Sequence, residues 1–311
     1  MLDVATEVQL ATLLSDIGRT ISDLTTQADD RLAGLPPGDL TVTVGIGTRL
    51  VRGIDPSLPG AEQLATYSRE QMTDSCRGGD LWLQICASDP LVVPLGAAAL
   101  SDMMGTRTIE RWRQDAVRGA NVPFGGSASA PRNILGFIDG VIAPRGETAL
   151  AQNVWINAPQ RIRGASIVVL RRMELDVERF VQLPVAEQEE IFGRRRNNGS
   201  PLSGGTLGTL PDLGAKTPDG RYLIPTHAHL RRTNAAAVGV GTMLRRSYST
   251  VQPAGLLFVS FQNDLATFTK TLDRMEQSDA LLPFTTTTAA ATFLVLPGFT
   301  TAEPLGSGLF S

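Results

Sequence analysis

The sequence predicts an α+β fold built from two similar halves, residues 1–150 and 151–311. Apolar residues recur at every second position from Leu81 to Ala87, as on a strand, and the chain then leads through Asp89 and Pro90 into a helix. Residues 256–262 repeat this arrangement and lead through Asp264 into a second helix. A strand followed by a helix in each half is typical of an antiparallel sheet with helices on one face.

The remaining elements complete each half. In the first half the pattern predicts a helix over 8–24, strands over 41–46 and 81–87, and a helix over 91–104. In the second half it predicts a strand over 166–175, a helix over 177–192 interrupted at Pro184, strands over 223–231, 243–249, 256–262 and 292–296, and a helix over 265–275. The second half opens with a strand and the first with a helix, so we expect a strand to be missing upstream of Met1.

Composition excludes several classes of protein. The chain has 311 residues with a net charge of −3, and no basic stripe marks a nucleic-acid surface. The longest apolar run, residues 91–100, is too short to span a membrane. No secretion signal opens the chain, so it is expected to be cytoplasmic as it stands, or exported if an upstream signal has been lost. Its oligomeric state is left open, with a homo-oligomer as one option.

The only two histidines of the chain, His227 and His229, lie two residues apart. On a strand both rings would point to one face. The same spacing is also expected of two partly exposed strand histidines that bind nothing. A zinc site needs more ligands than two histidines and two cysteines readily supply. A heme needs only one imidazole, because the porphyrin brings four nitrogens of its own.

Two further motifs carry charged side chains. Asp139 lies within residues 136–140, Gly-Phe-Ile-Asp-Gly, inside a long loop rich in glycine and proline at 121–145. By itself an aspartate between glycines is usually a turn former. Arg245 lies in the hydrophobic strand predicted at 243–249, where its charge needs a partner or an exposed face.

Together, and in this order, these motifs resemble the dye-decolorizing peroxidase family. Residues 136–140 resemble its GxxDG motif, His229 resembles its proximal heme ligand, and Arg245 its distal arginine. The resemblance runs from about Val4 to the C-terminus. It implies two ferredoxin-like halves, with heme b held in the C-terminal half.

The resemblance also implies a role for each site residue. His229 would ligate the iron and donate its other ring nitrogen to Asp279, while Asp139 would move a proton of hydrogen peroxide and Arg245 would stabilise the developing charge. Other residues expected around the cofactor are Arg194 at a propionate, Ser247 holding a water, Arg231, and Phe261 in the pocket wall. The proton acceptor would be the carboxylate of Asp139, so activity is expected to be highest at acid pH.

The implied function is a peroxidase that oxidises dyes or other bulky organic molecules. A surface tryptophan or tyrosine could relay electrons from such a substrate to the buried heme, and the candidates are Trp82, Trp112, Trp155, Tyr222 and Tyr248. One alternative is release of iron from heme (a deferrochelatase) or porphyrinogen oxidation. A second is a non-catalytic heme-binding protein, which would not need Asp139 and Arg245 together.

Overall fold

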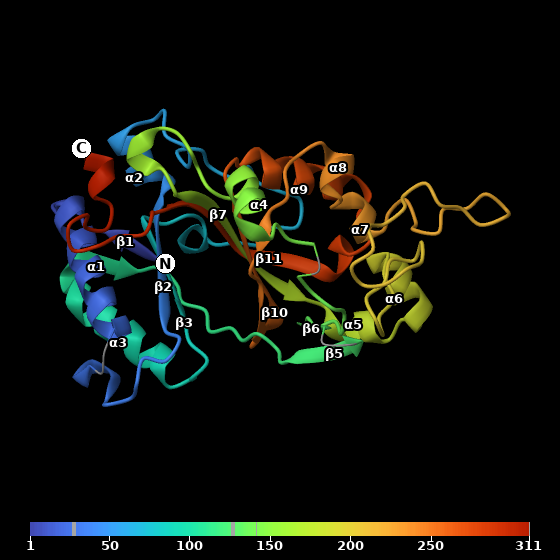
Figure 1. Cartoon of the computed structure of the whole chain (residues 1–311), viewed down its shortest axis with the longest axis horizontal. Coiled ribbons are helices and arrows are strands. Elements are labelled where there is room, and N and C mark those ends of the chain that lie inside the picture. Colours follow the sequence, from blue (N-terminus) through green and yellow to red (C-terminus); the bar gives the residue numbers. More distant parts are fainter. Residues whose placement is uncertain (27–28, 126–127, 141, 311) are drawn as a thin grey trace.

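The computed structural model describes residues 1–26, 29–125, 128–140 and 142–310. Figure 1 shows most of the first half at the left and most of the second half at the right of an elongated molecule, with the C-terminus back at the left. Within the described residues one nine-stranded sheet runs through both halves, in the order β4-β1-β3-β2-β11-β7-β10-β8, and β9 also pairs with β10.

The first half contains four strands of this sheet and two long helices. The strands are β1 (Leu2–Val4), β2 (Thr41–Gly47), β3 (Leu81–Cys86) and β4 (Thr108–Glu110). The helices are α1 (Leu10–Thr26), α2 (Thr48–Ile54) and α3 (Val92–Met104). α1 and α3 pack on the sheet through apolar side chains at helical spacing, among them Leu14, Ile17 and Leu100.

The second half contains the remaining strands and the shorter helices. The strands are β7 (Ser166–Leu175), β8 (Leu244–Arg245), β9 (Tyr248–Val251), β10 (Ala254–Gln262) and β11 (Thr285–Val295). The helices are α4 (Gly146–Asn153), α5 (Val177–Val181), α6 (Val185–Phe192), α7 (His229–Arg232), α8 (Ala235–Val238) and α9 (Ala266–Ser278). The break between α5 and α6 falls at Pro184, as the sequence predicts.

Both halves have the same topology. With β8 and β9 counted together as one strand, both halves follow the order fourth, first, third, second, which is β4-β1-β3-β2 in one half and β11-β7-β10-β8 in the other. The halves join where β2 pairs antiparallel with β11, with Leu294 opposite Ile46. The expected duplicated fold with antiparallel sheets is confirmed.

The beginning of the first half differs from the expectation. β1 precedes α1 and pairs with both β3 and β4, so the half opens with a strand and not with a helix. This strand is three residues long, too short for an alternating pattern to show in the sequence. A longer strand upstream of Met1 stays a prediction.

The two faces of the sheet are covered differently. On one face Phe258 of β10 packs against Phe268 of α9, with ring centroids 5.9 Å apart. On the other face Val259 and Phe261 join a cluster with Trp82 and Phe293. Because side chains alternate along a strand, the even-numbered residues of β10 face α9 and the odd-numbered ones face this cluster.

Three expected elements take another form. The strand predicted at 223–231 is absent: that segment is irregular and ends in α7, because its alternation reflects packing of Ile224, Ala228 and Leu230 in a small core. The strand at 243–249 is divided into β8 and β9. The long loop at 121–145 contains a short hairpin of β5 (Asn121–Gly125) and β6 (Ala128–Pro131).

Among the described residues, no helix combines the length and apolar character needed to cross a membrane.

Candidate active site

The loop that carries Asp139 is held by local hydrogen bonds. The side chain of Asn133 accepts hydrogen bonds from the backbone N–H groups of Leu135 and Phe137, both at 3.1 Å. Gly136 has a φ of 85°, a conformation that glycine adopts without steric cost. The N–H of Asp139 donates to the carbonyl of Pro131 at 3.0 Å. The loop therefore closes on itself immediately before Asp139.

Phe137 anchors this loop to the protein core. Its side chain is buried and stacks on Phe192 of α6, with centroids 3.8 Å apart and planes 9° apart. Phe180 contacts both rings edge-on. Such aromatic pairs add about 0.5–1.5 kcal/mol to the burial of the rings. Asp139 is thus positioned by a rigid apolar cluster two residues earlier in the chain.

β8 and β9 bring Arg245 and Ser247 to the same face of the sheet. Arg245 is opposite Ser260, and Tyr248 is opposite Leu257. Alternation then places Arg245, Ser247 and Ser249 on the α9 face and Tyr248 on the other. The Arg245 guanidinium lies 3.5 Å from the carbonyl of Ile142, just beyond the loop of Asp139.

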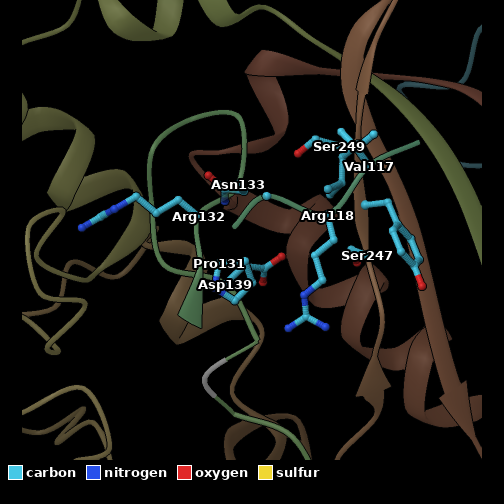
Figure 2. A pocket seen from close by; sticks show the side chains of 11 residues that line it. Val117, Arg118, Pro131, Arg132, Asn133, Asp139, Ser247 and Ser249 are labelled. Carbon is cyan, nitrogen blue, oxygen red and sulfur yellow. The ribbon is translucent and has the colours of Figure 1, made fainter. Parts of the chain in front are cut away.

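Asp139 and Ser247 line one small cavity, together with Arg118, Ser249 and Leu256. Figure 2 shows Asp139 on one side of this cavity, Ser247 on the other, and Arg118 between them. Its volume is about 10 Å³. That is roughly the space that one water needs, and the carboxylate and hydroxyl offer the polar partners that a buried water requires.

His229 forms a pair with Asp279. Nδ1 of His229 lies 2.8 Å from Oδ2 of Asp279, and the Asp279 side chain has no exposed surface. A carboxylate only accepts hydrogen bonds, so Nδ1 is the donor. The other carboxylate oxygen accepts from the N–H of Leu281 at 2.8 Å. The pair leaves Nε2 of His229 with its lone pair available, and no described residue hydrogen-bonds to that atom.

His227 has none of these features. Its side chain is exposed, and its carbonyl accepts a hydrogen bond from the N–H of Ala280 at 2.9 Å. The expectation that both rings share one strand face is wrong, because residues 223–228 are irregular and His229 begins α7.

Arg194 is a buried cation without a carboxylate. Its Nη1 donates to the carbonyl of Gly199 at 2.7 Å, and no ion pair with Arg194 is formed in the described part of the chain. Burial, and then the positive charge of Arg245, lower the pKa of the Arg194 guanidinium to about 10. A buried charge is costly unless it is paired, so this arrangement favours a bound anion near Arg194 and Arg245.

Two expected site residues lie elsewhere. Phe261 is on the face of β10 opposite to Arg245 and packs against Trp82, at 6.2 Å between centroids, so a place in the pocket wall stays a prediction that this geometry does not support. Arg231 donates to the carbonyls of Leu213 and Ile224, both at 2.7 Å. These bonds tie α7 to the preceding loop, and a contact of Arg231 with a cofactor stays a prediction.

Sequence reasoning missed Leu256 and Arg118. Leu256 shares the face of Ser247, and only the register between β9 and β10 distinguishes it from Leu257. Arg118 reaches the cavity because Val117 pairs with Ser249 through two backbone hydrogen bonds. No signal in the sequence links those two residues. Of the candidate relay residues, Trp155 and Tyr222 are each 40% exposed, whereas Trp82 is buried.

Comparisons with known proteins identify the family of the chain. The family models for the N-terminal and C-terminal parts of Dyp-type peroxidases match residues 1–115 and 130–300. A dye-decolorizing peroxidase of Thermobifida fusca is 31% identical over 85% of this chain and 66% of its own length. A deferrochelatase of Yersinia pestis is 30% identical over 86% of this chain and 66% of its own length. The chain thus spans just under two thirds of these relatives.

Solved structures show the same likeness in three dimensions. The chain is similar to DtpA from Streptomyces lividans, at 29% identity and a TM-score of 0.89 over 100% of this chain and 91% of that one. It is similar in the same way to a DyP-type peroxidase from Cellulomonas bogoriensis, at 28% identity, a TM-score of 0.89 and the same coverage. The chain belongs to the Dyp-type peroxidase family.

Proposed function

We propose that this protein binds heme b and uses it to reduce hydrogen peroxide and to oxidise dyes or other bulky organic molecules. The observation that carries the proposal is the His229–Asp279 pair, whose geometry leaves Nε2 free to bind iron. The relative from Thermobifida fusca that supports it is a dye-decolorizing peroxidase, and the DtpA structures are of ferric and oxyferrous forms.

The residues present fit a heme. Nε2 of His229 would be the one ligand that a heme requires from the protein. Asp279, fully buried, holds the ring by its hydrogen bond to Nδ1 and makes Nε2 a stronger donor. Arg194 is a buried cation that forms no ion pair among the described residues, and a heme propionate would supply the missing negative charge. The buried hydroxyl of Ser260, opposite Arg245, also has no hydrogen-bond partner among the described residues.

The chain's own residues would handle protons and charge. Bound heme supplies the iron at which the peroxide O–O bond is broken. Asp139 accepts a proton from hydrogen peroxide and returns it to the departing oxygen. Arg245 stabilises the negative charge that develops as this bond breaks. Ser247 shares the small cavity with Asp139 and holds a water through which the proton can pass.

The test of the proposal is the purified protein supplied with heme. We expect a Soret band and oxidation of an anthraquinone dye that depends on hydrogen peroxide. Iron release from heme, measured with a ferrous chelator, tests the second candidate, which the similarity to a deferrochelatase favours. Iron release without any dye oxidation would replace the peroxidase proposal. A Soret band with neither activity would indicate a non-catalytic heme carrier.

Dye oxidation is expected to be fastest at acid pH. An aspartate acceptor stays ionised in acid, where an imidazole is already protonated and cannot accept. The net charge of −3 also moves toward positive as pH falls, which favours an anionic dye. Stopped-flow measurement of heme oxidation by peroxide without dye separates the two effects. An inflection near neutrality that persists in Asp139→Asn would show that another group accepts the proton.

A further inference from the structure

A second hollow lies on the outer side of the loop that carries Asp139. It has a volume of about 480 Å³ and is lined by Arg132, Gly136, Val185, Glu189, Arg196 and Asn197. This volume is in the range of small-molecule sites. It shares only Arg132 with the small cavity of Asp139. Figure 2 shows the Arg132 side chain pointing away from Asp139, Arg118 and Ser247.

The positive charges of this hollow are not neutralised by carboxylates. Arg132 donates only to backbone carbonyls, those of Gly136 at 2.8 Å, Arg196 at 2.6 Å and Asn197 at 2.7 Å. The Arg196 guanidinium takes part in no ion pair within the part of the chain that the structure describes. It lies against Gly136, where an added Cβ would be 3.1 Å from its Nε and Nη2.

The one carboxylate in the lining is already satisfied. Glu189 is buried and accepts from the backbone N–H of Arg196 at 2.9 Å and from Nη1 of Arg195 at 2.8 Å. Its negative charge is therefore offset by Arg195, and Arg132 and Arg196 leave the hollow positive. Val185 adds an apolar surface that is 50% exposed.

We propose that this hollow binds a flat organic anion, an aromatic sulfonate or carboxylate, and that it is the docking site of the reducing substrate. The planar guanidinium of Arg196 presents paired N–H donors to the oxygens of such an anion, whereas the compact ammonium of a lysine would act only as a point charge. Val185 offers apolar contact for the ring, beside the Arg196 guanidinium that covers Gly136. The assignment of the anion as reductant rests on the proposed peroxidase function, whereas the binding itself does not.

Binding is tested by calorimetric titration of the heme-loaded protein with 2-naphthalenesulfonate. Arg196→Gln should raise Kd about tenfold, the effect of one charge-assisted hydrogen bond. Val185→Asp should have a similar effect, because it adds a negative charge at the rim. Val185 is the first residue of α6, where an acidic side chain is compatible with the helix. The control is Arg113→Gln, which removes an exposed arginine in the first half.

Kinetics then test the role of the anion. Arg196→Gln should raise KM for hydroquinone sulfonate about tenfold and leave KM for neutral hydroquinone unchanged. Heme oxidation by peroxide alone should keep its wild-type rate in this variant, which separates the docking site from the peroxidase proposal. Equal Kd values for Arg196→Gln and wild type would overturn the inference. So would no binding by the wild type, or the same loss in Arg113→Gln.

Discussion

His229→Ala should lose most of its heme, whereas His227→Ala should keep it. Only His229 has a ring nitrogen fixed by a buried carboxylate and a second nitrogen without a partner among the described residues. Removing the imidazole removes the proposed iron ligand, so the Soret absorbance per protein should fall nearly to that of unbound heme.

Two further variants test whether the loss of heme is specific to the imidazole of His229. Asp279→Asn keeps the size of the side chain but removes its charge, and should weaken heme binding by about 10- to 100-fold. His227→Ala changes an exposed side chain and should have no measurable effect. If heme were lost from His227→Ala and retained by His229→Ala, the ligand assignment would be wrong.

Asp139→Ala and Arg245→Leu should each retain the Soret band and slow the oxidation of heme by peroxide. Loss of a positioned proton acceptor costs about 10²- to 10⁴-fold in rate. Loss of one group that stabilises developing charge costs about 10²- to 10³-fold. The measurement is stopped-flow absorbance after mixing with hydrogen peroxide, with no dye present.

Arg246→Leu is the matched control for this pair. Arg246 follows Arg245 directly, is exposed, and alternation places it on the opposite face of the sheet. Its removal should leave the rate unchanged, although the loss of net charge equals that in Arg245→Leu. Wild-type rates in both Asp139→Ala and Arg245→Leu would contradict the proposed catalytic roles of these two residues.

The long elements follow from the sequence because their patterns are local. The 166–175 strand is predicted with the bounds that β7 has, and the proline break between α5 and α6 is predicted at its place. Short elements cannot be predicted from local patterns in this way. β1 has three residues and is defined by its partners, Leu81 in β3 and the residues of β4. α7 is a single turn inside a segment whose apolar alternation resembles a strand.

The duplicated α+β fold, the motif order that indicates the family, and the candidate residues His229, Asp279, Asp139 and Arg245 could all be predicted from the sequence. Which other side chains lie near these candidates follows from the three-dimensional structure. Phe261 and Leu256 are similar apolar residues of one strand, and the register with β8 and β9 sends them to opposite faces. Likewise, Arg194 and Arg196 are near neighbours in an arginine run. One is buried beside Arg245 and the other lines the outer hollow, because contacts distant in sequence set the direction of each side chain.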